Sequence, residues 1–415
     1  MKVLLVTQYF KPENLPVNFI ADSLVNNGYK LDVLTGKPNY PKGKFYKGFG
    51  FFSKIKQSFE NYDVYRVPIF PRGVKFRTLG LVLNYISFVF SASILGPLLL
   101  RKKKYDIIFV YANSPLTKAI PAIVLGKIKK IPVILWVQDL WPESFMATGY
   151  KLPVTLERLL NKIVSLIYDN VDLILGQSEA FVKRIKEEHP LNDRKVDYLP
   201  NTINSIFSPS LIIKTELTSH MDPFKDTFNI LFTGNIGEAQ SIETVILAAS
   251  EVKTRNLDNI NFIIVGGGSK LQESKDRAYE MNLENIHFLG SFPLEEMPSF
   301  INFSDVLLLT LKDELTFNLT VPNKLQSYLA SGKPILASLN GEAADLIIKS
   351  NSGFVVKSQD YKDLADKAIY MSEMKNNDLE ELGVNGYEYF DKNFSIEVFL
   401  RKISDFFNIA INSRK

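Results

Sequence analysis

The sequence predicts an α/β protein made of two doubly wound parallel-sheet domains that face each other across a central cleft. A chain of 415 residues is too long for one ordinary core, so two domains of roughly 200 residues each are expected. Short β-branched runs alternate with helical patterns in both halves, as in repeated βαβ units. A connector rich in Pro, Asn and Ser, LPNTINSIFSPS at 199–210, separates the halves. We place the domains at 1–200 and 201–390, with ligands expected in the cleft.

Each half carries its own series of predicted strands. The first half contains Val3–Val6, Leu31–Leu34, Ile107–Tyr111, Val133–Val137 and Leu173–Leu175, and the second contains Ile230–Phe232, Phe262–Val265, Val306–Leu309, Ile335–Ala337 and Phe354–Val356. A helix is expected from about Val17 to Asn27, ended by Gly28 where left-handed backbone is needed. No short repeat occurs, which excludes solenoids and propellers.

Composition excludes several classes of function. The formal net charge is only +4, so the field of the whole molecule does not favour nucleic acid as a partner. The absence of cysteine excludes disulfides, thiolate nucleophiles and cysteine metal sites. The three histidines at 189, 220 and 287 are isolated, so we expect no metal site. The start, MKVLLVTQYF, is too short for a signal-peptide core, which indicates a cytoplasmic protein.

One segment differs from ordinary soluble sequence. Residues 78–100 carry no charge, and no acidic residue occurs between Asp63 and Asp106. Three interpretations remain open: a spanning helix, a buried helix that covers the sheet, and a helix near 78–104 with an apolar face toward a bilayer. A spanning helix would split the first sheet, and burial alone does not require the cations that flank the segment. We therefore favour the third interpretation.

The third interpretation assigns each face of this helix. Gly80, Asn84, Ser87 and Ser91 form one stripe that is expected to pack inward. Leu81, Ile86, Phe88, Val89 and Phe90 are spread over the remaining surface. The residues expected at an anionic membrane surface are Arg72, Lys75, Arg77, Phe88, Phe90, Arg101, Lys102, Lys103 and Lys104.

A carboxylate follows a predicted buried strand in the first half. In VILWVQDLWPES, Gln138 and Asp139 come directly after Val137, where ligands bind in parallel sheets. Asp139 can orient or deprotonate an acceptor hydroxyl there. The alternative is that it only caps the following turn.

Glycines and a lysine mark possible anion sites in the second half. Gly234, Asn235 and Gly237 lie between a strand and a helix that starts near Ser241, where backbone amides can approach an anion. The turn Gly266–Gly268 is similar, but such turns also serve purely conformational needs. In LTVPNKLQSYLASGKPI, the sequence predicts Pro322 in the first turn of a helix with Thr320 and Lys324 beside it. A helix start, a hydroxyl and a lysine together form a diphosphate cradle. The alternative is an ordinary surface lysine.

These segments resemble glycosyltransferase family 4, the retaining enzymes of the GT-B fold, across almost the whole chain. The resemblance is carried, in order, by QYFKPENLPVNFIADSLVNNGYKLDVLTGKPNYP, VILWVQDLWPES, LPNTIN, FTGN, IIVGGG, NIHFLGSFPLEEMPSFINFSDVLLL and YLASGKPILAS. GKPNYP, WVQDLWPES and LTVPNKLQSYLASGKPI resemble the subgroup that builds O-antigen or capsule units, including N-acetylfucosamine transferases. GT-B implies two Rossmann-like domains, and the helix at 391–415 is expected to cross back onto the first of them.

The resemblance implies site residues and substrates. A UDP-sugar would be held mainly by the second domain, and neither a metal nor another cofactor is expected. The donor-binding residues implied are Gly234, Asn235, Gly237, Gln240, Gly267, Phe292, Thr320, Val321 and Lys324. Asn14, Asn18 and Gln138 would lie near the acceptor or the sugar, and Asp139 would be the catalytic carboxylate.

The sequence departs from the family in several positions. Asn235 and Gln240 are neutral where many members carry an Arg and a Lys, which raises the importance of Lys324. Leu319 and Ser327 stand where a pair of glutamates is usual, so the ribose contact is unassigned. Gln138 replaces a common His, and the glycine-rich first loop has become Pro16, Val17 and Asn18.

Three functions remain in competition. The first is transfer of a sugar, such as an N-acetylated hexosamine or deoxyhexosamine, from UDP to a polyprenyl-diphosphate-linked saccharide at the inner face of the plasma membrane. The second is a UDP-sugar 2-epimerase of the same fold, which the apolar segment disfavours. The third is an inactive membrane-bound scaffold, which the missing charged residues would allow.

Overall fold

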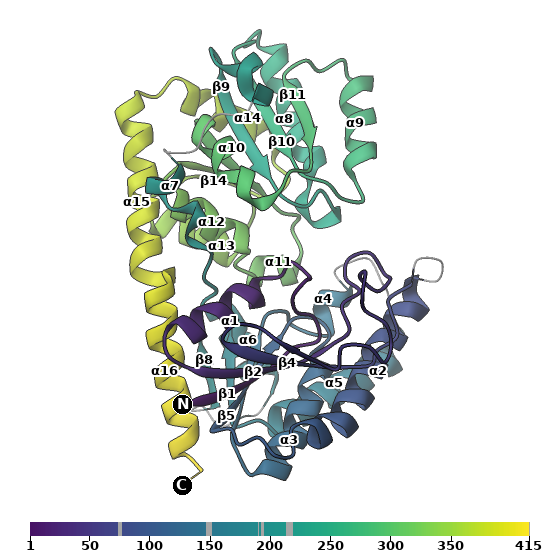
Figure 1. Cartoon of the computed structure of the whole chain (residues 1–415). Helices are drawn as coiled ribbons and strands as arrows, with labels where there is room; N and C mark the ends of the chain where they lie inside the picture. Colours follow the sequence, from purple (N-terminus) through teal and green to yellow (C-terminus); the bar gives the residue numbers. More distant parts are fainter. Residues whose placement is uncertain (74–76, 147–151, 190, 192–194, 213–218, 415) are drawn as a thin grey trace. The chain divides into compact units, whose positions relative to one another are not determined.

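The computed structural model describes residues 1–73, 77–146, 152–189, 191, 195–212 and 219–414. The chain divides into two compact units (Figure 1). Unit 1 comprises Met1–Pro200 with Phe399–Lys415, and unit 2 comprises Asn201–Val398. Each unit contains one sheet.

Unit 1 has an eight-stranded sheet in the order β3-β4-β2-β1-β5-β6-β7-β8. Its strands are β1 (Lys2–Val6), β2 (Lys30–Gly36), β3 (Lys56–Ser58), β4 (Tyr62–Val67), β5 (Ile107–Ala112), β6 (Val133–Val137), β7 (Leu173–Gly176) and β8 (Val196–Tyr198). Only β3 pairs antiparallel with its neighbour, β4. The five strands predicted for this half are confirmed, whereas β3, β4 and β8 were not predicted because charged and polar residues interrupt their apolar character.

Seven α-helices of the described chain accompany this sheet. They are α1 (Pro16–Asn26), α2 (Arg77–Leu99), α3 (Ile120–Lys129), α4 (Glu143–Met146), α5 (Val154–Asp169), α6 (Glu179–Glu188) and α16 (Ile396–Asn412), with a 3-10 turn, η1 (Leu116–Ala119), before α3. The predicted first helix is confirmed, and Gly28 beyond it adopts a φ of +85°. From Phe399 onward α16 belongs to unit 1. Its Phe399 ring lies 5.2 Å from Trp136, measured between centroids.

Unit 2 has a six-stranded, wholly parallel sheet in the order β11-β10-β9-β12-β13-β14. Its strands are β9 (Phe228–Thr233), β10 (Ile260–Val265), β11 (Ile286–Gly290), β12 (Val306–Thr310), β13 (Ile335–Ser338) and β14 (Gly353–Val356). All five strands predicted for this half are confirmed, and β11 at the edge is additional. The α-helices are α7 (Pro209–Ile212), α8 (Ile242–Thr254), α9 (Leu271–Glu280), α10 (Met297–Phe303), α11 (Leu315–Leu319), α12 (Asn323–Ser331), α13 (Glu342–Lys349), α14 (Tyr361–Ser372) and α15 (Asn376–Phe394).

Alternate residues of the unit 2 strands enter two separate apolar cores. Leu231 and Leu307 pack with helices α10, α12 and α13 on one face. Phe232 and Leu308 pack with α8, α9 and α14 on the other. A parallel sheet covered by helices on both faces requires apolar residues in both alternating positions. This packing confirms the doubly wound architecture that the sequence predicts.

The order of strands reverses direction at one point in each sheet. In unit 1 the reversal lies between β1 and β5, and in unit 2 between β9 and β12. Ligands of doubly wound sheets bind outside the carboxyl ends of the strands at such a point. The loops after these four strands therefore define where a site should be sought in each unit.

Helix α2 buries a different stripe from the one predicted. Asn84 is buried as expected, but Phe88 and Ala92 continue the buried stripe in place of Ser87 and Ser91. This follows the four-residue spacing of one helix face. Phe88 is fully buried, so its assignment to a membrane surface is wrong.

Candidate functional site

The most distinctive group in unit 2 is the ammonium of Lys324. Lys324 is the second residue of α12, and its Nζ lies 3.5 Å from the centroid of the Phe232 ring. A Cβ added at Gly234 would lie only 3.1 Å from Lys324 Cε. The side chain thus reaches across to the carboxyl end of β9. Although its stem is partly exposed, Nζ is buried and has no hydrogen-bond partner among the described residues.

Burial lowers the pKa of Lys324 to about 7. A charged ammonium without hydrogen bonds is costly away from water, so the neutral amine gains relative to the cation. The N–H of Leu325 donates to the carbonyl of Pro322 at 2.9 Å, whereas the N–H groups of Asn323 and Lys324 have no acceptor within their helix and point toward its N-terminal end. An anionic ligand at this end would satisfy both the amides and the ammonium.

The residues just before α12 contribute to the fold with their side chains. Thr320 Oγ1 donates a hydrogen bond of 2.7 Å to the carbonyl of Thr316, and Val321 is buried in the core. Pro322 is the N-cap of α12, one residue before the first turn where it was predicted. Of the side chains in this predicted diphosphate cradle, Lys324 is the one whose donor has no hydrogen-bond partner among the described residues.

Asn235 and Gln240, which stand where two cations are usual, are hydrogen-bonded to each other. Asn235 Nδ2 donates to Gln240 Oε1 at 3.2 Å, and the same oxygen accepts from the backbone of Gly237 at 3.0 Å. These bonds brace the loop between β9 and α8. The loop therefore brings no cation of its own at these two positions.

The glycine-rich turns have a steric explanation. A Cβ at Gly266 would lie 1.7 Å from the carbonyl oxygen of Gly234, and a Cβ at Gly268 would lie 2.2 Å from that of Ile236. The backbone of Ile236 also donates to the carbonyl of Gly267 at 2.8 Å. Close packing between the loops after β9 and β10 thus requires these glycines, whether or not a ligand binds beside them.

Phe292 follows β11 at the edge of the unit 2 sheet. Its ring lies 4.8 Å from that of Phe300 and 5.1 Å from the ring of His220, measured between centroids. Phe292 is partly buried against the apolar core. An aromatic ring fixed in this way can offer one side to another planar group.

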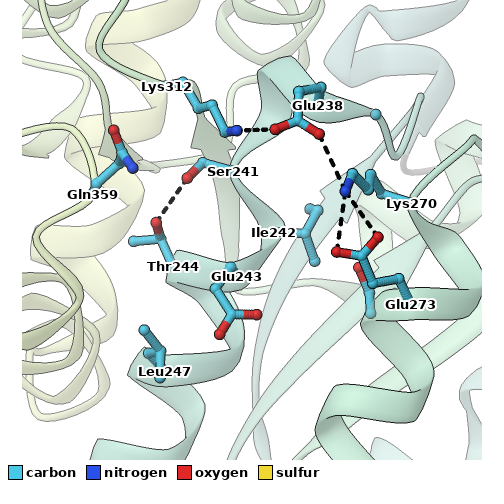
Figure 2. Close-up of a pocket in the computed structure, with 12 residues that line it drawn as sticks. Glu238, Ser241, Ile242, Glu243, Thr244, Leu247, Lys270, Glu273, Lys312 and Gln359 are labelled. Carbon is cyan, nitrogen blue, oxygen red and sulfur yellow. Dashed lines mark hydrogen bonds and ion pairs between the residues drawn. The ribbon is translucent and has the colours of Figure 1, made fainter.

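A hollow of about 360 Å³ is lined by the β9–α8 loop and by residues of α8 and α9 (Figure 2). Glu238 forms ion pairs with Lys312 and with Lys270, the latter at 3.2 Å, and Lys270 also pairs with Glu273 at 2.8 Å. Because its lysines are paired internally, this hollow suits a diphosphate less well than the end of α12 does. Among the described residues, no group of three or more His, Asp or Glu is arranged to hold a metal ion.

Asp139 in unit 1 connects two strand ends. Its Oδ2 accepts a hydrogen bond of 2.7 Å from the backbone of Ser114, in the loop after β5. Burial raises the pKa of Asp139, while the Ser114 amide and the charge of Lys118 oppose the shift. The described partner is Ser114 and not the turn that follows Asp139. Next to it, Nε2 of Gln138 is buried without a hydrogen-bond partner among the described residues.

The loop after β1 is organised by a carboxylate that the sequence did not single out. Glu13 is fully buried and accepts hydrogen bonds from the backbone of Phe10, Asn39 and Tyr40 at 3.0, 2.7 and 2.7 Å. Burial raises the pKa of Glu13 to about 7.

The two asparagines predicted in this loop differ. Asn18 accepts from the backbone of Lys11 at 3.1 Å and donates to the carbonyl of Glu13 at 2.6 Å. Asn14 is exposed. Asn18 therefore braces the loop, whereas Asn14 is available to a ligand.

Helix α2 presents a long apolar stripe to solvent. By length and composition, Leu79–Leu99 is the one helix among the described residues that could cross a membrane. Its inner stripe packs in unit 1, and α2 contacts α3 and β4 (Figure 1). Its exposed large side chains are Leu79, Val82, Leu83, Ile86, Phe90, Ile94 and Leu98. Phe90 is 64% exposed, unlike Phe88.

The cations predicted at a membrane differ in their surroundings. Arg101, Lys102 and Lys104 are exposed at the end of α2. Lys103 instead forms ion pairs with Asp32 and Asp63 at 3.6 and 3.2 Å, because these carboxylates face it from β2 and β4. Lys75 and the side chain of Arg77 lie outside the described part of the chain. The guanidinium of Arg72 lies against the rings of Tyr9, Tyr40 and Tyr85.

Two family models match the chain. "Glycosyltransferase Family 4" matches residues 17–205, and "Glycosyl transferases group 1" matches residues 215–389. The chain is 26% identical to the probable glycosyltransferase WbjE of Pseudomonas aeruginosa, over 81% of this chain and 82% of WbjE. It is 23% identical to the putative colanic acid biosynthesis glycosyl transferase WcaI of Escherichia coli K12, over 80% and 82% of the two chains. Anabaena Alr3699/HepE, solved with UDP and glucose, superposes with a TM-score of 0.67 at 15% identity, covering 98% of this chain and 99% of that one.

Proposed function

Because the chain belongs to the GT-B glycosyltransferases, with one glycosyltransferase family model matching each half, we propose that it transfers a sugar from a UDP-sugar to a polyprenyl-diphosphate-linked saccharide. We further propose that the reaction retains the anomeric configuration, needs no metal and belongs to O-antigen or capsule assembly. A relative named for colanic acid biosynthesis and a structural neighbour solved with UDP and glucose support this proposal. The sugar proposed is an N-acetylated hexosamine or deoxyhexosamine, such as N-acetylfucosamine.

The observation that carries the donor assignment is the buried, unpartnered ammonium of Lys324. As the bond between the sugar and the UDP breaks, negative charge grows on the leaving diphosphate. A cation and helix N–H groups held in place before the reaction stabilise that charge without reorganising. Since Asn235 and Gln240 are neutral and bonded to each other, Lys324 supplies the positive charge that the β9–α8 loop lacks.

Asp139 is proposed to act on the acceptor. The carboxylate is fixed by Ser114 at the carboxyl end of β6. Burial raises its pKa, which makes the carboxylate a better proton acceptor than one in water. It can therefore orient the attacking hydroxyl of the acceptor and accept its proton as the new glycosidic bond forms.

Helix α2 is proposed to hold the enzyme at the inner face of the plasma membrane, as a peripheral or monotopic protein. Its exposed apolar stripe ends beside Arg101, Lys102 and Lys104, a combination that binds anionic bilayers. Lys103 is not part of this surface, since Asp32 and Asp63 neutralise it.

Charge reversal tests the membrane proposal. The triple variant R101E/K102E/K104E should lower the binding constant for phosphatidylglycerol vesicles, measured by sedimentation, about 100-fold. This estimate takes about 1 kcal/mol for each cation near the surface. The matched control K186E/K349E/K357E reverses three exposed cations elsewhere and should sediment as the unmodified chain does. Equal effects of the two triple variants would contradict a docking role for the end of α2.

Transfer itself is tested by incubating the protein with a panel of UDP-sugars and lipid-linked saccharides, followed by mass spectrometry of the lipid. The proposal predicts one elongated lipid product with release of UDP. An epimerised UDP-sugar without a lipid product would indicate a 2-epimerase, and UDP-sugar binding without any product would indicate an inactive scaffold.

A further inference from the structure

A polar cluster lies at the carboxyl edge of the unit 1 sheet, where the strand order reverses. Tyr9 follows β1 and Lys118 lies in η1 after β5, the two strands on either side of the reversal. Asp139 follows β6, the next strand. Arg72, between β4 and α2, and Tyr85, on α2, complete the cluster. This is where a doubly wound sheet binds ligands.

Arg72 is held by tyrosines and not by a carboxylate. Its Nε donates to the Tyr9 hydroxyl at 3.0 Å and one Nη donates to the Tyr85 hydroxyl at 3.2 Å. The guanidinium lies 5.0, 4.8 and 5.8 Å from the ring centroids of Tyr9, Tyr40 and Tyr85. No described residue accepts from its other Nη. Aromatic faces and hydroxyls thus position the cation without neutralising it.

A second basic residue, Lys118, lies near this arginine, and burial lowers its pKa to about 7. It is fully buried, with its Nζ 5.7 Å from the centroid of the same Tyr9 ring and hydrogen-bonded to Asn113. The carboxylate of Asp139 acts electrostatically on Lys118. The carboxylate of Glu13 also acts on Tyr9, but it already accepts hydrogen bonds from three backbone N–H groups. Arg72 therefore keeps an uncompensated charge on the partly exposed side of the cluster.

The cluster is attached to the apolar helix. The Asn84 side chain on α2 accepts from the Tyr9 hydroxyl at 2.6 Å and from Gln8 Nε2 at 2.8 Å. The inner side of α2 is thus connected to the guanidinium of Arg72. Asn84 is linked to it through the Tyr9 hydroxyl, and Tyr85 accepts from it directly. The outer side of the same turns carries Val82 and Ile86, both exposed. One helix therefore has a cationic cluster on one side and an apolar surface on the other.

We propose that the guanidinium of Arg72, caged by Tyr9, Tyr40 and Tyr85, binds the diphosphate of the lipid-linked acceptor. This inference rests on the proposed function. The planar fork of arginine matches phosphate oxygens and can donate two parallel hydrogen bonds to them. Where Lys118 is protonated, below about pH 7, its charge adds to the positive field at Arg72. Because Arg72 lies next to α2, this one helix would hold the lipid chain on its apolar side and the diphosphate on its other side.

The test measures binding of a short-chain, water-soluble prenyl diphosphate and the matching monophosphate to the full chain by calorimetry. The unmodified protein should prefer the diphosphate. Arg72→Gln should weaken diphosphate binding at least about 10-fold, the loss expected for a charged hydrogen-bonding group, and should remove the preference. The diphosphate affinity of Arg72→Lys should lie between those of the unmodified protein and Arg72→Gln. Arg401→Gln, which removes an exposed arginine of α16, should bind as the unmodified protein does.

A second variant separates failure of the inference from failure of Arg72→Gln to fold. Tyr85→Phe keeps the arginine and the ring but removes one hydroxyl contact, so diphosphate binding should fall by a few-fold even if Arg72→Gln does not fold. Unchanged diphosphate affinity in folded Arg72→Gln, or a loss confined to phosphatidylglycerol vesicles, would overturn the inference. If the protein binds the prenyl diphosphate through Arg72 but transfers no sugar, the proposed function fails while this inference stands.

Discussion

Lys324 in unit 2 and Arg72 in unit 1 are two solutions to the same problem, a cation held ready at the end of a parallel sheet. Both lie against aromatic rings, Lys324 on Phe232 and Arg72 on three tyrosines. Lys324 has no described hydrogen-bond partner, and burial lowers its pKa to about 7. The pKa of Arg72 is raised, because burial is outweighed by the neighbouring tyrosines. The lysine can lose its charge at physiological pH, whereas the arginine cannot.

This difference predicts that ligand binding depends on pH more strongly at the donor site than at the acceptor site. It also predicts that changes in the two units have separable effects. A variant in unit 1 should affect sugar transfer or acceptor binding, and a variant at α12 should affect the binding of UDP.

The largest expected effect is that of Asp139→Asn. The asparagine can still accept the hydrogen bond from Ser114, but it cannot carry negative charge or take a proton. We expect kcat to fall about 100-fold or more while the UDP dissociation constant, measured by calorimetry, stays within a factor of two. Comparable losses in kcat and UDP affinity would show that Asp139 acts through the fold.

The next effect in size is that of Lys324→Ala. Removal of a charged donor from the diphosphate should weaken UDP binding about 10- to 100-fold in calorimetry. The control is Lys312→Ala, which removes a lysine already paired with Glu238 and should leave UDP affinity unchanged. If the two variants bind UDP equally, Lys324 does not hold the diphosphate.

The pH dependence of UDP binding is the smallest of the three effects. Lys324 carries its charge below its pKa, so affinity should fall as the pH rises above about 7. The decrease approaches tenfold per pH unit, since one proton must then be taken up for each UDP bound. Prenyl diphosphate binding should fall much less over the same range, because Arg72 keeps its charge and only the more distant Lys118, whose pKa is also about 7, loses its own. Parallel pH profiles for the two ligands would remove the contrast between the units.

Much of the fold was predictable because strands covered on both faces need unbroken apolar runs. Phe262–Val265 and Ile107–Tyr111 are such runs. The edge strand β3 (Lys56–Ser58) contains no apolar residue, and β4 mixes Asp63 and Arg66 with apolar side chains, so no periodicity indicated them. These strands form because neighbouring strands supply hydrogen bonds, which is information from the tertiary fold.

The candidate site was predictable only where one local segment builds it. Lys324 stood out because a helix start and a lysine occur together in the sequence. The inward turn of Arg72 depends on tyrosines that come from three separate segments, and Lys118 is buried at a position with no sequence signal. Phe88 was misassigned because the buried stripe of α2 follows Asn84 and Ala92, a phase that only packing reveals.

The central claim is that the ammonium of Lys324 binds the diphosphate of UDP. Calorimetry of UDP binding at pH 8 in buffers of different ionisation enthalpy measures it directly, because most Lys324 is neutral there before UDP binds. We predict an uptake of close to one proton for each UDP in the unmodified protein, and none in Lys324→Ala. Binding of UDP without proton uptake in the unmodified protein would contradict the claim.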